Sequence, residues 1–154
     1  MQIMAVQVGN AIVALDPGQP LTVSVGDTLR VFYAFNYKVA ETTGVEIWAS
    51  LYKYVVGILN RQEQAQKKQT ITLEKAIEWR PYEGEIDIGV GDVSPGTYGL
   101  ICELPKYDVE HHIDDCIEVT APPSVWEMMG PLLVLGLMAG MVSMMAPMME
   151  EGFS

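Results

Sequence analysis

The stretch Leu29-Arg30-Val31-Phe32-Tyr33-Ala34-Phe35-Asn36-Tyr37 decides the fold class. Large apolar or aromatic side chains recur at every second position from Leu29 to Tyr37, while Arg30 and Asn36 stand on the alternate face. A period of two is the signature of a β-strand that buries one of its faces. The sequence therefore predicts a long strand here, with one side in a hydrophobic core.

Similar short alternations surround this stretch, and Gly, Pro, Asp or Asn separate them about every ten residues. The clearest of them are 21–25, 45–51, 86–90, 98–104 and 113–119. About seven short strands with regular turn signals are typical of a β-sandwich or barrel. We therefore expect an all-β, antiparallel domain of about seven strands over residues 1–120.

Two segments are harder to interpret from the sequence. Residues 60–68 are polar and predict an exposed connection, while residues 73–79 could continue a strand or turn helical. On the expected strand 45–54, the face opposite the core carries Trp48, Tyr52 and Tyr54. That face is too aromatic to be simply solvated, so we expect part of it to meet another part of an assembly.

Two motifs resemble the immunoglobulin-like sandwich modules, including those related to fibronectin type III. One is Val25-Gly26-Asp27-Thr28-Leu29-Arg30-Val31-Phe32-Tyr33, and the other is Ser94-Pro95-Gly96-Thr97-Tyr98-Gly99-Leu100. The resemblance implies that Tyr98 packs inward and that its hydroxyl bonds back to the chain. Leu100 stands where antibody domains have a cysteine, so their inter-sheet disulfide is not expected. Such modules mostly bind or space other molecules.

Charge excludes several classes of partner. The chain has 9 Lys and Arg against 20 Asp and Glu, and a formal net charge of −11. A nucleic-acid partner is not expected, because phosphate binding requires clustered basic side chains. Adsorption to anionic lipid is disfavoured for the same reason. The first residues lack a basic region followed by an apolar run, so we expect no signal peptide.

The C-terminal part of the sequence is strongly apolar. Residues 121–125 (Ala-Pro-Pro-Ser-Val) form a Pro-rich linker, residues 126–149 a predicted hydrophobic α-helix, and residues 150–154 an acidic tail. No charged residue occurs from Met128 to Met149. About twenty apolar residues are needed to cross a bilayer core, so this segment just qualifies. Trp126 is the expected anchor at an interface.

Small side chains gather on one side of this predicted helix. On a helical wheel they form a stripe of Gly136, Ala139, Gly140, Ser143 and Ala146. Small residues four apart allow a second helix backbone to approach closely, so we expect helix packing that makes a homo-oligomer. Three environments stay open: a membrane, a dry helical core between subunits, or the domain's own core.

Candidates for chemistry are few. His111, His112, Asp114 and Asp115 are residue types that ligate zinc, but adjacent histidines on a strand point to opposite faces, which favours an acidic hairpin loop. Cys102 and Cys116 are expected on neighbouring strands, with a packed Cys102 and a partly exposed Cys116, although a one-residue shift in register would let them bridge. No catalytic motif, metal site or cofactor site is predicted.

These observations together predict a non-enzymatic structural or assembly protein of the virion or surface-layer type. Its acidic β-sandwich would be displayed, and its C-terminal helix would dock into a membrane or a helical assembly core. The alternative is a membrane-anchored binding module that recognises a protein or carbohydrate through its sandwich loops.

Overall fold

Strand β4 (Thr28–Val39) contains the stretch that decided the fold class. The structure, a computed structural model, describes residues 1–121. Leu29, Val31, Tyr33 and Phe35 are all buried, as their spacing predicts. The alternation of the following strand is also confirmed, because Val45, Ile47, Ala49 and Leu51 of β5 (Thr43–Val55) are buried.

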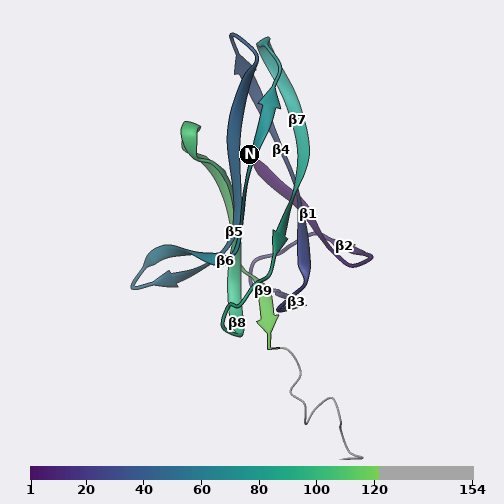
Figure 1. The fold of residues 1–154 in the computed structure, drawn as a ribbon, viewed down its shortest axis with the longest axis vertical. Helices are drawn as coiled ribbons and strands as arrows, with labels where there is room; N and C mark the ends of the chain where they lie inside the picture. The colour runs from purple at the N-terminus through teal and green to yellow at the C-terminus, as the bar shows by residue number, and fades with distance from the viewer. Residues whose placement is uncertain (122–154) are drawn as a thin grey trace, which may run out of the picture. The chain divides into compact units, whose positions relative to one another are not determined.

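The described residues form nine strands in two sheets (Figure 1). The four-stranded sheet has the order β2-β1-β4-β7, in which β1 is Gln2–Val8, β2 is Ala11–Val13 and β7 is Ala76–Gly89. The five-stranded sheet has the order β3-β9-β8-β5-β6, in which β3 is Leu21–Ser24, β6 is Ile58–Leu73, β8 is Gly96–Leu104 and β9 is Val109–Thr120. A short 3-10 helix, η1 (Pro105–Tyr107), joins β8 to β9.

One hydrophobic core joins the two sheets. It contains Leu29 and Val31 from the first sheet together with Ile47, Leu51 and Leu100 from the second. Burial of these side chains is the main favourable contribution to folding. The all-β prediction is confirmed for residues 1–121.

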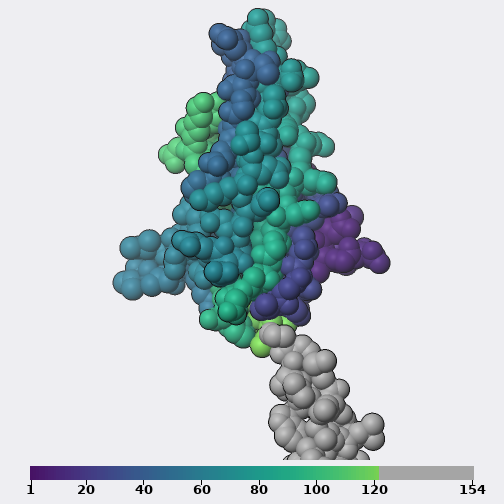
Figure 2. Space-filling model, viewed as in Figure 1, coloured from purple at the N-terminus to yellow at the C-terminus, as the bar shows by residue number. Residues whose placement is uncertain are grey.

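The chain passes between the two sheets five times, and two of these connections flank the pair β5 and β6. β4 leads into β5 of the other sheet, and β6 leads back into β7. The far end of β5 turns into β6 by a hairpin that projects from the body, on the left of Figures 1 and 2. This hairpin lies at the end of β5 that is far from its first residue, Thr43.

The strand count and the pairing differ from the prediction. Nine strands replace about seven, and β3 pairs with β9 in parallel, from Leu21 opposite Ile117 to Ser24 opposite Thr120. The other strand pairs of the described residues are antiparallel. The parallel pair joins segments about a hundred residues apart, and local alternation contains no information about such a contact.

The structure decides both segments that were hard to interpret: the first interpretation was wrong, and the second, left open between strand and helix, is a strand. The polar residues 60–68 are not a connection but part of the 16-residue strand β6. This strand lies at the edge of its sheet, where Lys, Gln and Glu face water and oppose edge-to-edge aggregation. Residues 76–79, which could have been helical, belong to β7.

The predicted linker beyond Ala121, the hydrophobic helix 126–149 and the acidic tail 150–154 lie outside the described residues. The same holds for Trp126 and for the small-residue stripe of Gly136, Ala139, Gly140, Ser143 and Ala146. Over residues 1–121, the structure has no helix that is both long and apolar enough to cross a membrane.

Candidate functional site

An apolar cleft opens beside β4, β7 and η1. Its floor contains the buried side chains of Phe35, Leu73 and Leu104, and its volume is about 270 Å³. The rest of the lining is mostly apolar and comprises Met1, Asn36, Tyr37, Lys38, Val39, Trp79, Tyr107 and Val109. A concave, apolar site with a few polar groups at its margin is the usual form of a binding site.

Two aromatic side chains stand exposed at the margin of this cleft. Trp79 of β7 is 69% exposed, and Tyr107 of η1 is 43% exposed. A lysine ammonium covers each ring: Lys38 Nζ lies 4.8 Å from the Trp79 ring centroid, and Lys106 Nζ lies 5.7 Å from that of Tyr107. Large aromatic groups left in water beside an apolar hollow mark an interaction surface.

The second exposed apolar feature is the tip of the β5–β6 hairpin. Its residues are Val55, Val56, Gly57 and Ile58, and Val55 pairs with Ile58 across a two-residue turn. Val56 is 95% exposed and Ile58 is 71% exposed. We call these four residues the hairpin tip. In Figure 2 it forms the projection at the lower left of the molecule.

The backbone of Val56 is unfavourable for its residue type. Both turn residues have positive φ, 52° at Val56 and 76° at Gly57, as a type I′ hairpin turn requires. Asn-Gly is the preferred pair for this turn, and a β-branched residue with positive φ is a clear outlier. Such a residue costs about 1–3 kcal/mol. An exposed valine here stabilises neither the turn conformation nor the packing of the hydrophobic core.

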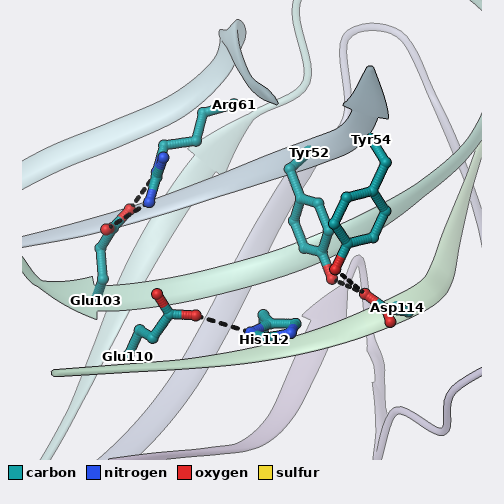
Figure 3. A network of polar contacts seen from close by, with 7 residues as sticks. All are labelled: Tyr52, Tyr54, Arg61, Glu103, Glu110, His112 and Asp114. Carbon is teal, nitrogen blue, oxygen red and sulfur yellow. Dashed lines mark hydrogen bonds and ion pairs between the residues drawn. The ribbon is translucent and has the colours of Figure 1, made fainter. Parts of the chain in front are cut away.

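A polar network fixes the base of the hairpin to β9 (Figure 3). The hydroxyls of Tyr52 and Tyr54 both donate to Oδ1 of Asp114, and the Tyr54 bond is 3.1 Å long. The two rings pack edge to face, 5.6 Å apart. Burial, then the hydrogen bond to Asp114, raise the pKa of Tyr52 well above its usual range. The tip therefore extends from a base that two strands hold together.

An ion pair and a histidine–carboxylate contact lie near this network. Arg61 of β6 donates two hydrogen bonds to the Glu103 carboxylate of β8, from Nε at 2.6 Å and from Nη2 at 2.8 Å. His112 Nδ1 lies 2.8 Å from Glu110 Oε2, and the His112 ring packs edge to face on Tyr52. The domain itself thus covers part of the aromatic face of β5, since Tyr52 is buried while Tyr54 is exposed.

The residues considered as metal ligands are not brought together. His111 Nδ1 accepts a hydrogen bond from the Ile3 backbone at 2.9 Å, whereas His112 contacts Glu110 on the other face of β9. Asp114 binds the tyrosines, and the Asp115 carbonyl accepts from the Gly18 backbone at 3.1 Å. Among residues 1–121, the structure contains no group of three or more ligand-type side chains placed to hold a metal.

Both cysteines are free thiols, and both are buried. Cys102 lies opposite His111 in the register, and Cys116 donates from Sγ to the Ile113 carbonyl at 3.3 Å. The expectation of a partly exposed Cys116 was wrong. Asp115 has a φ of 48°, which interrupts the alternation of β9 and turns Cys116 into the core. Burial raises the pKa of each thiol to about 12.

The inward position of Tyr98 is confirmed. Its side chain is buried, and its hydroxyl donates to the Ser94 carbonyl at 2.5 Å, which ties the start of β8 to the preceding turn. Lys53 Nζ lies 4.5 Å from the centre of the Tyr98 ring.

No protein-family model matches the chain, and no curated protein matches it in sequence. The indications of function therefore come from the exposed apolar surfaces of the β-domain.

Sequence reasoning missed both surfaces. The cleft joins residues from β4, β6, β7 and the β8–β9 connection, so no single motif contains it. A signal for its margin exists in Ile77 and Trp79, two exposed apolar residues on one face of a strand that is otherwise polar there. The hairpin tip is visible as Val-Val-Gly-Ile, where a solvated turn would have polar residues.

Proposed function

We propose that the protein is a non-enzymatic structural or assembly protein, such as a component of a virion or a surface layer. Its acidic domain, a sandwich of the immunoglobulin-like type, would form the displayed part. Residues 126–149 would dock as a helix into a membrane or into a helical core shared by several copies. The hydrogen bond from Tyr98 to Ser94 supports the immunoglobulin-like assignment.

The observation that carries this proposal is the surplus of apolar residues beyond the β-domain. The two sheets cover each other's apolar faces, so residues 1–121 have a core of their own. Residues 128–149 contain no charged side chain and many small ones on one stripe. An apolar segment that its own domain does not need is best covered by lipid or by helices of other copies.

The test compares the full chain with a chain that ends at Ser124. Light scattering measures the size of each in buffer and in a mild detergent, and thermal unfolding checks that the shorter chain folds. A large, regular oligomer that truncation removes supports assembly through the helix. If the shorter chain aggregates or is unfolded, the segment belongs to the domain's core and the proposal is wrong.

The alternative is a membrane-anchored binding module, and the cleft is the observation that favours it. Trp79 and Tyr107 present aromatic faces beside an apolar hollow, which suits a carbohydrate or a peptide side chain. Detergent-solubilised monomers whose tryptophan fluorescence changes on addition of oligosaccharides would favour this function. The same titration of Trp79→Phe, in which that change disappears, assigns the response to the cleft.

A further inference from the structure

We propose that the hairpin tip of one copy inserts into the apolar cleft of a second copy and joins the copies head to tail. This inference rests on the proposed function in assembly and names a second contact for it, within the β-domain. The partner is another copy of this chain, because the chain itself presents both a projecting apolar tip and an apolar hollow.

The tip and the cleft of one copy lie too far apart to meet. Leu73, in the floor of the cleft, pairs with Thr43 at the start of β5, whereas the hairpin tip begins at Val55, the last residue of β5. A strand rises about 3.3 Å per residue, so roughly 40 Å of strand lies between them. The network of Tyr52, Tyr54 and Asp114 holds the base of the hairpin on β9, which prevents it from folding back.

The sizes and the chemistry of the two surfaces agree. A cavity of roughly 150 Å³ accommodates a benzene ring. The cleft, at about 270 Å³, has room for two branched aliphatic side chains such as Val56 and Ile58. Its floor of Phe35, Leu73 and Leu104 is apolar, and the hairpin tip carries no charged side chain.

The backbone of Val56 is the second, independent observation. A turn selected for the isolated domain would have asparagine at this position of positive φ. Valine gains nothing there from its own domain, since the side chain is 95% exposed. Burial in a neighbour's cleft gives the side chain an apolar environment and explains why an unfavourable conformation is retained.

The contact joins two different surfaces, so it is heterologous. Repetition of a heterologous contact produces a ring if the rotation closes and a filament if it does not. One small contact binds weakly by itself, but copies already held together by their helices meet at a high effective concentration. The tip–cleft contact would then set the spacing of the displayed domains.

Disulfide trapping between full-length chains tests the contact. One chain carries Val56→Cys at the tip and a second, differently tagged chain carries Lys38→Cys at the margin of the cleft. The native Cys102 and Cys116 are buried and do not compete. We expect mixed dimers of the two variants after mild oxidation, and far fewer between Val56→Cys and Ile12→Cys, a control position that is also exposed.

A second variant provides an independent measurement. Val56→Asn suits the turn and keeps the fold, but removes the apolar tip. We expect it to weaken self-association of the full chain about tenfold, as loss of one buried branched side chain does. Ile12→Asn should leave self-association unchanged.

The outcomes separate the two proposals. If the full chain assembles through residues 126–149 but neither the mixed disulfide nor the effect of Val56→Asn is found, the tip–cleft contact is wrong and the proposed function stands. Cross-linking of Val56→Cys chains to each other at the same yield also overturns it, since that result indicates a symmetric tip-to-tip contact. A full chain that is monomeric without detergent overturns both.

Discussion

Arg61 and Glu103 form a two-point ion pair that spans a strand. Arg61 lies on β6 and Glu103 on β8, and β5 runs between them in the sheet. Glu103 is a buried charged residue, and Arg61 satisfies its carboxylate with two hydrogen bonds (Figure 3). The pair connects the polar edge strand to the interior of its sheet.

Removal of Arg61 should therefore destabilise the domain. Arg61→Met leaves the Glu103 carboxylate buried without its partner, and we expect the free energy of unfolding to fall by about 2 kcal/mol. The control is Arg30→Met, which breaks a similar pair with Asp87 on the exposed face of the other sheet. That loss should be less than about 1 kcal/mol. Urea unfolding measures both, and equal losses would contradict the prediction.

Loss of the Tyr98 hydroxyl should remove the partly buried hydrogen bond that ties β8 to the Ser94 carbonyl. We expect Tyr98→Phe to lower the free energy of unfolding by about 1–2 kcal/mol while the ring keeps its packing. Tyr37→Phe is the matched control, because the Tyr37 hydroxyl donates to the Glu74 carbonyl at an exposed site, where water replaces it. Thermal unfolding compares the two variants, and a Tyr98→Phe chain as stable as the control would be evidence against this tie.

Val56→Asn should stabilise the folded domain. Asparagine tolerates the positive φ at this position, so we expect the free energy of unfolding to rise by about 1 kcal/mol. Gly57→Ala provides the opposite sign, since alanine at a φ of 76° is strained. Equilibrium unfolding in detergent, where copies are separated, measures both variants. A destabilised Val56→Asn chain would show that the valine has a structural role.

Alkaline pH should destabilise the domain through its thiols. Burial raises the pKa of Cys102 and Cys116 to about 12, from an ordinary value near 9. Below pH 9 the thiols are protonated in both the folded and the unfolded chain, so their contribution to the free energy of unfolding is fully present. Above it the unfolded chain loses protons that the folded chain retains, so the free energy of unfolding falls, by up to about 1.4 kcal/mol per pH unit for each thiol. The slope between pH 9 and 10 should be smaller in the Cys102→Ala/Cys116→Ala double variant.

Acid should loosen the start of β1. His111 Nδ1 accepts the Ile3 N–H, which requires a neutral ring, and burial, followed by the neighbouring charges, lowers the pKa of His111. Above a pH of about 6.5, the ordinary pKa of histidine, the His111 ring is neutral and accepts the Ile3 N–H. As pH falls through the lowered pKa of His111 in the folded state, the ring is protonated and this hydrogen bond is lost. Amide hydrogen exchange at Ile3, corrected for intrinsic rates, should rise on acidification relative to Val6. His111→Gln, which keeps an acceptor that does not titrate, should remove this pH dependence.

The strands with regular alternation could be predicted, and the irregular ones could not. Leu29, Val31 and Val45 are buried as predicted because a one-sided core imposes a period of two. β6 was missed because it is an edge strand, so its polar residues face water. It also carries residues 62–65 as an insertion between the pairs Ser50–Gln66 and Tyr52–Arg61, and the Gly91 N–H donates to the Gln64 carbonyl there at 2.7 Å.

The two candidate surfaces differ in how far they could be predicted from the sequence alone. The cleft could not be predicted, because Phe35, Leu73 and Leu104 become neighbours only after two sheets have formed. The hairpin tip could be recognised from the Val-Val-Gly-Ile sequence once its turn position is known. Cys116 was misplaced because β9 has a bulge at the left-handed residue Asp115, which places Cys116 in the core beside Ile117.

The parallel pairing of β3 with β9 has a consequence for synthesis. Leu21–Ser24 leaves the ribosome early, but its partner Ile117–Thr120 is made about a hundred residues later. Contacts so distant along the chain slow folding, because a long loop must close before they form. During synthesis β3 therefore stays unpaired until the last residues of the domain appear. The five-stranded sheet is completed only just before the apolar segment 128–149 emerges.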